Sequence, residues 1–369
     1  MNFELTAAQH ELGGLTRQIL TDLVTPESLR EAESGQFNRA VWRELGRSGV
    51  LSAALPESAG GAGLGLLEQC SVLAEIGRTV APVPYLPSIM LGTAAIAEFG
   101  SYEQRAAWAV PAAQGELILA AALAEEDSED PRRPATTAQQ ADGHWQLTGV
   151  KTTVPAGLTA GELLVPASTP SGVAVFLVRP GDPGVTVMPQ EVTGGDGTAL
   201  VELVRATVPP ERILGSIGAG HTIVDWLTTR ETVGHCAIQL GVTERALELT
   251  AAHARSREQF GKPIGSFQAV AQRLADAYID VEGIRLTLWQ AAWRLSEGLP
   301  AEAEVATAKF WAAEAGHRVA HTAVHVHGGV GIDMDGEIHR FFAAAKYHEF
   351  ALGGATAQLR EIGRVLAGS

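Results

Sequence analysis

Apolar residues recur at helical spacing over residues 1–114. The segment 65–78 places its apolar side chains on one helical face, directly after the glycine-rich turn at 60–63. Thr25 followed by Pro26 marks a helix start, because Thr caps a helix N-terminus and Pro fits the first helical position. The pattern therefore predicts a helical N-terminal region.

The pattern changes to short extended runs between residues 115 and 215. Asp142-Gly143 lies between two such runs and is a dipeptide typical of a two-residue hairpin turn. Further β-rich runs, separated by Pro and Gly, lie at 116–120, 162–166, 173–178, 185–188 and 199–204. Repeated short strands with turn residues between them predict a small β-barrel or sandwich.

From residue 216 onward the spacing is helical again. Long amphipathic segments lie at 221–255, 266–298, 301–325 and 336–366. In the second of them the apolar residues follow a three-four repeat, as in a helix bundle. The predicted fold class is α+β, with the following domains: an N-terminal α-helical domain (1–114), a middle β-barrel domain (115–215) and a C-terminal four-helix bundle (216–369).

Composition narrows the functional classes. With 369 residues, 46% of them hydrophobic and 19% charged, the chain is typical of a packed multidomain protein. A net charge of −15 and the lack of any Lys or Arg run argue against nucleic acid or an anionic membrane surface as a partner. Two cysteines cannot build a disulfide framework. The first residues lack the basic and apolar regions of a secretory signal, and no apolar stretch is long enough for a membrane span. We expect a soluble, cytoplasmic protein.

The stretch 257–265, Arg-Glu-Gln-Phe-Gly-Lys-Pro-Ile-Gly, followed by Phe-Gln-Ala-Val at 267–270, closely resembles the acyl-CoA dehydrogenase family. His-Gly-Gly-Val-Gly at 327–331 resembles the family's glycine turn, and 51–65 resembles its N-terminal helix-turn signature. The helix, sheet, helix order also agrees over nearly the whole chain. The resemblance implies FAD-dependent α,β-dehydrogenation of an acyl-CoA thioester, with electrons passed on to electron-transfer flavoprotein.

The resemblance assigns a set of residues to FAD. In the family, the matching positions reach across a subunit interface to the adenosine and pyrophosphate of a neighbour's FAD; here they are Arg257, Phe260, Gln268, Gly328 and Gly329. The residue types suit that role, because Arg offers paired donors and a glycine turn lets backbone N–H groups approach an anion. The alternative is that Arg257 pairs with a surface acid and the glycines merely end a helix.

Family members remove the α-proton with a glutamate. Most carry it in a Tyr-Glu-Gly-Thr element, but the matching stretch 350–356 has no acid. A minority carry it on the first helix of the C-terminal bundle, which corresponds to Glu231. Glu231 is also the only charged residue of an apolar helical stripe, where burial would raise its pKa toward that of a base. The alternatives are that Glu231 pairs with a neighbouring Arg, and that Glu349 is the base.

The middle domain departs from the family pattern. Residues 124–131 are rich in acids where the family has a Thr-Glu-Pro-Gly-Ala-Gly-Ser-Asp-like loop, and Thr153 replaces the tryptophan that lies against the flavin. This combination resembles degenerate subunits of heteromeric actinobacterial acyl-CoA dehydrogenases that act on sterol side chains in steroid degradation. We therefore expect one subunit of an α2β2 heterotetramer acting on a bulky acyl-CoA, with a homotetramer as the alternative.

Other functions stay open at this point. The chain could be a non-catalytic subunit that only completes the FAD site of a neighbouring chain. Another flavin activity on the same fold, such as an oxidase or nitroalkane oxidation, is a further possibility. His321, His325 and His327 have spacings that can bind metal, but no acid or cysteine completes the set and the family uses no metal. We predict no metal site.

Overall fold

The computed structural model describes residues 3–32, 37–128, 130–195, 197–334 and 336–368. The chain divides into two compact units, which we call the helical unit and the mixed unit after their secondary structure. The helical unit comprises Met1–Asp22, Leu66–Ala81 and Thr232–Ser369, and the mixed unit comprises Leu23–Gly65 and Pro82–Glu231. The division falls inside one long helix, after Glu231.

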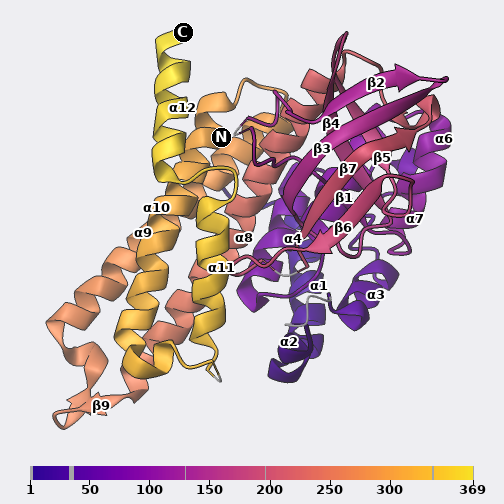
Figure 1. Ribbon diagram of the computed structural model, residues 1–369. Coiled ribbons are helices and arrows are strands. Elements are labelled where there is room, and N and C mark those ends of the chain that lie inside the picture. The colour runs from indigo at the N-terminus through magenta and orange to yellow at the C-terminus, as the bar shows by residue number, and fades with distance from the viewer. Residues whose placement is uncertain (1–2, 33–36, 129, 196, 335, 369) are drawn as a thin grey trace. The chain divides into compact units, whose positions relative to one another are not determined.

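The mixed unit contains an eight-stranded sheet in its described part (Figure 1). Its strands are β1 (Leu119–Ala121), β2 (Thr137–Ala141), β3 (His144–Val154), β4 (Glu162–Thr169), β5 (Gly172–Val178), β6 (Val185–Pro189), β7 (Ala199–Val208) and β8 (Ile213–Leu214). The order is β6-β7-β3-β2-β4-β5-β8, and β1 lies parallel to β4. The predicted extended runs thus lie in one sheet.

The sheet bends over a single core. Asp142 and Gly143 connect β2 to β3 with positive φ angles of 51° and 79°, the conformation that a two-residue hairpin turn requires. Trp145 of β3 and Phe176 of β5 are not on neighbouring strands, yet their ring centroids lie 5.6 Å apart. Among the described strands no pairing joins β6 to β8, so the predicted barrel is an open, strongly bent sheet.

Short helices of the mixed unit precede the sheet. They are α2 (Pro26–Ala32), α3 (Arg39–Arg47), η1 (Glu57–Ala59), η2 (Tyr85–Thr93), α5 (Ala94–Phe99), α6 (Tyr102–Gln104), η3 (Arg105–Ala109) and α7 (Val110–Ala113), with η4 (Pro210–Arg212) before β8. Thr25 Oγ1 accepts a hydrogen bond from Ser28 N at 3.2 Å, as expected for an N-cap. Asn38 caps α3 in the same way, through Ala40 N and Val41 N.

The helical unit is a bundle. It contains α1 (Ala7–Leu23), α4 (Leu66–Thr79), most of α8 (Gly220–Ser256), a hairpin of β9 (Glu258–Gln259) and β10 (Lys262–Pro263), η5 (Ile264–Ser266), α9 (Gln268–Ser296), α10 (Glu302–His327), η6 (Gly328–Gly331), α11 (Ile338–Phe350) and α12 (Ala355–Gly368). A Cβ added to Gly241 of α8 would lie 1.9 Å from the carbonyl oxygen of Ala74 in α4. The two helix backbones are therefore in direct contact.

One predicted helix is two helices. The segment 336–366 is divided into α11 and α12 by residues 351–354, where Leu352 and Gly353 have positive φ angles of 55° and 90°. At the end of α11, Lys309 Nζ donates to the carbonyl oxygens of His348 at 2.8 Å and Glu349 at 3.0 Å. This buried ammonium satisfies carbonyls that a helix end leaves without partners.

The helix, sheet, helix order of the prediction is confirmed, while the domain boundaries at 114 and 215 stay a prediction. Within the described residues, no helix is both long and apolar enough to cross a bilayer.

Candidate functional site

Glu231 lies on α8 with 6% of its surface exposed. Burial raises the pKa of its carboxyl to about 7, because the charged form loses hydration. A carboxyl with that pKa can both accept and release a proton near neutral pH. The expected burial of Glu231 is therefore observed, while its catalytic role stays a prediction.

The surroundings of α8 beyond Glu231 are more polar than the apolar stripe indicates. Residues 231–237 and 239–243 are buried on every side of the helix, and they include His235 and Gln239. His235 Nδ1 lies 2.9 Å from Nδ1 of His348 on α11. Gln239 Nε2 donates to backbone carbonyl oxygens of α10 and α11. Sequence reasoning missed this polar row, although its spacing of four after Glu231 signals it.

Burial keeps His235 and its partner His348 neutral. It lowers the pKa of His235 to about 3 and that of His348 well below its ordinary value, and the nearby Lys309 ammonium lowers both further. Because neither ring is charged, one nitrogen donates and the other accepts. The pair joins α8 to α11 inside the bundle.

Glu349, the second candidate base, is held in place by two side chains. Its carboxylate lies 2.6 Å from Lys346 Nζ and 3.2 Å from His317 Nδ1. The arrangement favours a structural role for Glu349.

Arg257 begins a different region, where α8 ends. Its backbone N donates to the carbonyl oxygen of His253 at 2.8 Å, and its side chain is exposed. Within the described residues its guanidinium has neither a hydrogen bond nor an ion pair, so the alternative of a surface acid as partner is not observed. A guanidinium without a partner is available to bind an anion.

The residues after Arg257 are equally accessible. Phe260 sits in the turn between β9 and β10 with a positive φ of 53°, and it is 93% exposed. Its ring contacts that of Phe267 edge to face, with centroids 6.1 Å apart. Gln268 is the first residue of α9 and is exposed.

The glycine turn lies where α10 ends. Gly328 has a positive φ of 67°, and its N–H donates to Val324 O, which ends the helix. A Cβ added at Gly328 or Gly329 would meet no heavy atom within 4 Å, so one side of this turn is open. Both glycines are exposed. A ligand can therefore approach the backbone closely here.

A pair of histidines connects the two halves of this region. The rings of His253 on α8 and His327 on α10 are stacked, with centroids 4.3 Å apart and planes inclined by 23°. His253 lies one turn before Arg257, and His327 directly precedes Gly328. The structure thus brings Arg257 and the glycine turn to one end of the bundle.

The other histidines considered for metal binding do not form a cluster. His321 packs against His317 of α10 and Phe342 of α11, and His325 is exposed. In the part of the chain that the structure describes, there is no group of three or more His, Cys, Asp or Glu side chains able to hold a metal ion.

The proposed base and the anion-binding end are far apart. Glu231 and Ser256 are separated by 25 residues of the continuous helix α8, which corresponds to about 38 Å along its axis. Glu231 therefore lies in the first half of α8, and Arg257 lies directly after its last residue.

The acid-rich loop before β2 is tied down by its own contacts. Glu125 accepts hydrogen bonds from Ala135 N and Thr136 N, and pairs with Lys151 Nζ at 2.5 Å. Both side chains of the pair are buried, and burial lowers the pKa of Lys151 to about 8. Glu129 of this loop lies outside the described residues. The acids of this loop add negative charge and few donors.

Two backbone donors at the end of β3 are already engaged. The backbone N of Thr153, at the position that the resemblance assigns to the flavin-stacking tryptophan, donates to Gln190 Oε1 at 2.6 Å. The neighbouring Thr152 N donates to Ala124 O at 3.0 Å. These two N–H groups are therefore not available to a flavin ring, whereas the guanidinium of Arg257 at the end of the bundle is available to a diphosphate.

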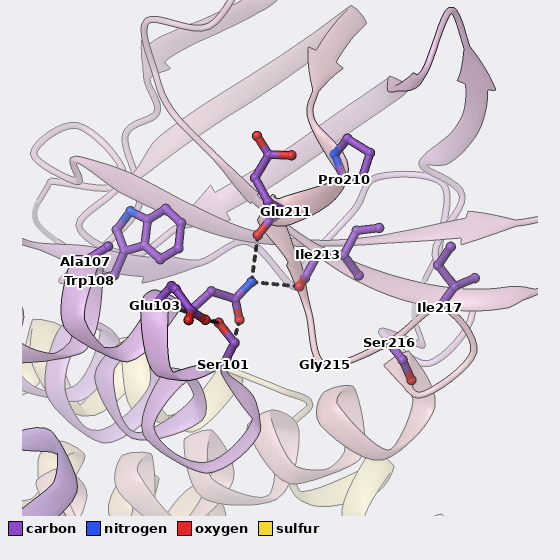
Figure 2. Close-up of a pocket in the computed structure, with 11 residues that line it drawn as sticks. Ser101, Glu103, Ala107, Trp108, Pro210, Glu211, Ile213, Gly215, Ser216 and Ile217 are labelled. Carbon is purple, nitrogen blue, oxygen red and sulfur yellow. Dashed lines mark hydrogen bonds between the residues drawn. The ribbon is translucent and has the colours of Figure 1, made fainter.

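The mixed unit has a surface cavity of about 490 Å³ that contains none of the predicted site residues (Figure 2). Gln104 is one of its lining residues, and its Nε2 donates to the carbonyl oxygens of Glu211 at 2.9 Å and Ile213 at 2.8 Å. The indole of Trp108 forms one wall and donates to the buried carboxylate of Glu162 at 3.0 Å. These bonds connect α6 and η3 to β4 and β8.

Comparison with known proteins gives consistent similarities. Models of the acyl-CoA dehydrogenase N-terminal domain and C-terminal domain match residues 6–116 and 218–367. The chain is 52% identical to acyl-CoA dehydrogenase FadE27 of Mycobacterium tuberculosis (strain ATCC 25618 / H37Rv), covering 100% of this chain and 99% of the relative.

Solved structures agree with this similarity. A chain in the crystal structure of the ChsE4-ChsE5 complex from Mycobacterium tuberculosis is 52% identical, with a TM-score of 0.95 and 100% of both chains covered. A chain of the Tcur3481-Tcur3483 steroid ACAD G363A variant is 40% identical, with a TM-score of 0.91 and 98% of both chains covered.

Proposed function

Because this chain belongs to the acyl-CoA dehydrogenase family, we propose that it is one subunit of a heteromeric enzyme that dehydrogenates a bulky, sterol-type acyl-CoA with FAD. The observation that carries the proposal is a difference between the end of the bundle and the end of β3. The end of the bundle presents an unpaired Arg257 beside an open glycine turn, while the backbone N–H groups of Thr152 and Thr153 at the end of β3 are already used. Such a chain can complete a cofactor site but not build a whole one.

The names of similar proteins support a heteromer. One solved relative is a ChsE4-ChsE5 complex, and another is a Tcur3481-Tcur3483 steroid ACAD, so each contains two different chains. We infer a heterotetramer with a second acyl-CoA dehydrogenase subunit, a steroid-derived acyl-CoA as substrate and electron-transfer flavoprotein as electron acceptor. Both cysteines are free and buried, in keeping with a cytoplasmic location.

In this proposal, Arg257, Phe260, Gln268, Gly328 and Gly329 bind the adenosine diphosphate part of FAD held by the partner subunit. Arg257 neutralises the phosphate charge, and the open turn at Gly328 and Gly329 lets a phosphate approach the backbone closely. When bound, FAD accepts the hydride that leaves the β-carbon of the thioester.

Glu231 is the proposed base for the α-proton. Its burial keeps water away and its pKa of about 7 leaves a large share of the carboxylate ionised at neutral pH. The carboxylate takes the α-proton and holds it on an oxygen until release to solvent. The alternative is a subunit that only completes its partner's site, and the engaged backbone N of Thr153 favours that alternative.

The test is to purify the chain alone and together with the partner subunit, and to record the visible flavin spectrum. We expect flavin colour only with the partner, and a large loss of bound flavin in Arg257→Ala. A homotetramer of this chain alone, fully loaded with FAD, would contradict the heteromer.

Glu231→Gln separates the two candidate functions. If Glu231 is the base, this variant complex keeps its flavin but is no longer bleached by the acyl-CoA. Unchanged bleaching would assign catalysis to the partner subunit and leave this chain as the non-catalytic one.

A further inference from the structure

The stacked rings of His253 and His327 form part of the accessible end of the bundle, between Arg257 and Gly328. Neither ring was assigned to the cofactor by the family motifs. Their position in the middle of that region places two titratable groups beside the anion site. What they do there depends on which ring nitrogen carries a proton.

The structure fixes the tautomer of His327. Its Nδ1 lies 2.8 Å from the carbonyl oxygen of Ala323, four residues earlier on α10. A carbonyl oxygen can only accept, so Nδ1 carries the hydrogen and Nε2 of the neutral ring has none. The neutral ring therefore has no second donor, and it can donate from Nε2 to a phosphate only after gaining a proton.

Charges around His253 disfavour that proton in the free protein. Partial burial, His327 from α10 and Arg257 from the end of α8 all lower the pKa of His253. Among the described residues, no carboxylate acts on this ring in the opposite direction. The free protein therefore disfavours a proton on His253, and an incoming dianion would oppose this effect.

We propose that His253 and His327 are a proton-linked part of the dinucleotide site, and that the pair takes up a proton when the diphosphate of FAD binds beside Arg257. The inference rests on the proposed function, because it deepens the site assigned there. The added proton supplies a new N–H donor and a positive charge next to the phosphates. Linkage then requires that FAD binds more tightly as pH falls.

The test uses the complex of this chain with its partner subunit. The dissociation constant for FAD is measured between pH 6 and pH 8 by flavin fluorescence, and proton uptake is measured by titration calorimetry in two buffers with different ionisation enthalpies. We expect wild-type affinity to rise as pH falls, by at most about tenfold per pH unit for one proton. Proton uptake is expected in the same range.

Two variants isolate the pair. His253→Phe combined with His327→Phe keeps an aromatic stack without titratable groups, and His327→Gln keeps a donor that takes up no proton. Both are expected to bind FAD with a much weaker pH dependence. His10→Phe is the matched control, since His10 is an exposed histidine whose Nδ1 also contacts a carbonyl oxygen four residues earlier.

The outcomes separate the inference from the proposed function. FAD binding with an unchanged pH dependence in both variants would overturn the inference and leave the proposed function standing. A complex that binds no FAD at any pH would overturn both. Coenzyme A contains the same adenosine diphosphate chemistry, so its affinity is measured in parallel. Loss of the pH dependence for coenzyme A and not for FAD would also overturn the inference.

Discussion

At the scale of single residues, burial decides the protonation state of Glu231. The ordinary pKa of 4.5 rises to about 7 in the folded chain, and the difference corresponds to about 3 kcal/mol. The unfolded chain ionises this group at lower pH than the folded chain does. Folding stability is therefore lost as pH rises from about 4.5 to 7, and stays reduced above that range.

Glu231→Gln should remove this pH-dependent cost. We expect the variant to gain stability relative to wild type at pH 8, by up to about 3 kcal/mol, and to gain little at pH 4. Thermal or urea unfolding at both pH values measures the difference. Glu202→Gln, at an exposed position of β7, is the control. An equal effect of Glu231→Gln at both pH values would contradict the pKa assignment.

A second prediction at this scale concerns the buried ion pair of Glu125 and Lys151. Glu125→Leu leaves a fully buried ammonium without its counter-charge and should cost about 3–5 kcal/mol of folding stability. Adding Lys151→Met removes that uncompensated charge, so the double variant should recover part of the loss. The recovery is partial because Ala135 N and Thr136 N still lose their acceptor. A double variant less stable than Glu125→Leu would refute this account.

At the scale of elements, local patterns predicted the helices and strands well. The hairpin at Asp142-Gly143 and the strands after it follow from alternation and turn chemistry, which act between near neighbours. The break after α11 was not predicted, because Lys309, distant in sequence, supplies the contact that ends this helix. His235 and Gln239 were missed for the same reason, since their partners lie on α10 and α11.

In the candidate site, too, local motifs were predictable from the sequence, whereas contacts between distant residues were not. Arg257, Phe260 and the glycine turn form local motifs, so the sequence was enough to name them. The stacking of His253 on His327 joins residues of two different helices, α8 and α10, so no local pattern contains it. The hydrogen bond from the backbone N of Thr153 to Gln190 likewise could not be predicted without the fold.

The close crossing of α4 and α8 gives a prediction at this scale. Gly241→Ala would place a Cβ 1.9 Å from the carbonyl oxygen of Ala74, so the helices must separate. We expect a loss of about 1–3 kcal/mol or more in unfolding free energy. The control is Gly363→Ala in α12, where the new Cβ meets nothing within 4 Å and Ala should stabilise by up to about 1 kcal/mol. Equal effects at the two sites would contradict the close contact.

At the scale of the whole molecule, exposed apolar residues mark a candidate surface for the proposed partner subunit. Along the hairpin and the first half of α9, Phe260, Tyr278 and Ile279 are 93%, 60% and 63% exposed. Single exposed apolar residues are common, but these lie on consecutive elements that directly follow Arg257 and include Gln268. If a partner subunit covers this surface, the same contact brings its FAD to the anion-binding end.

Ile279→Asp should therefore weaken assembly and cofactor binding together. A buried carboxylate without a partner opposes association, so we expect loss of the complex in size-exclusion chromatography and a matching loss of bound flavin. Val204→Asp is the control, because Val204 is 62% exposed but lies on β7 of the mixed unit. Ile279→Asp that assembles normally would place the interface elsewhere. Loss of flavin with assembly intact would show that this surface holds the cofactor without holding the subunits together.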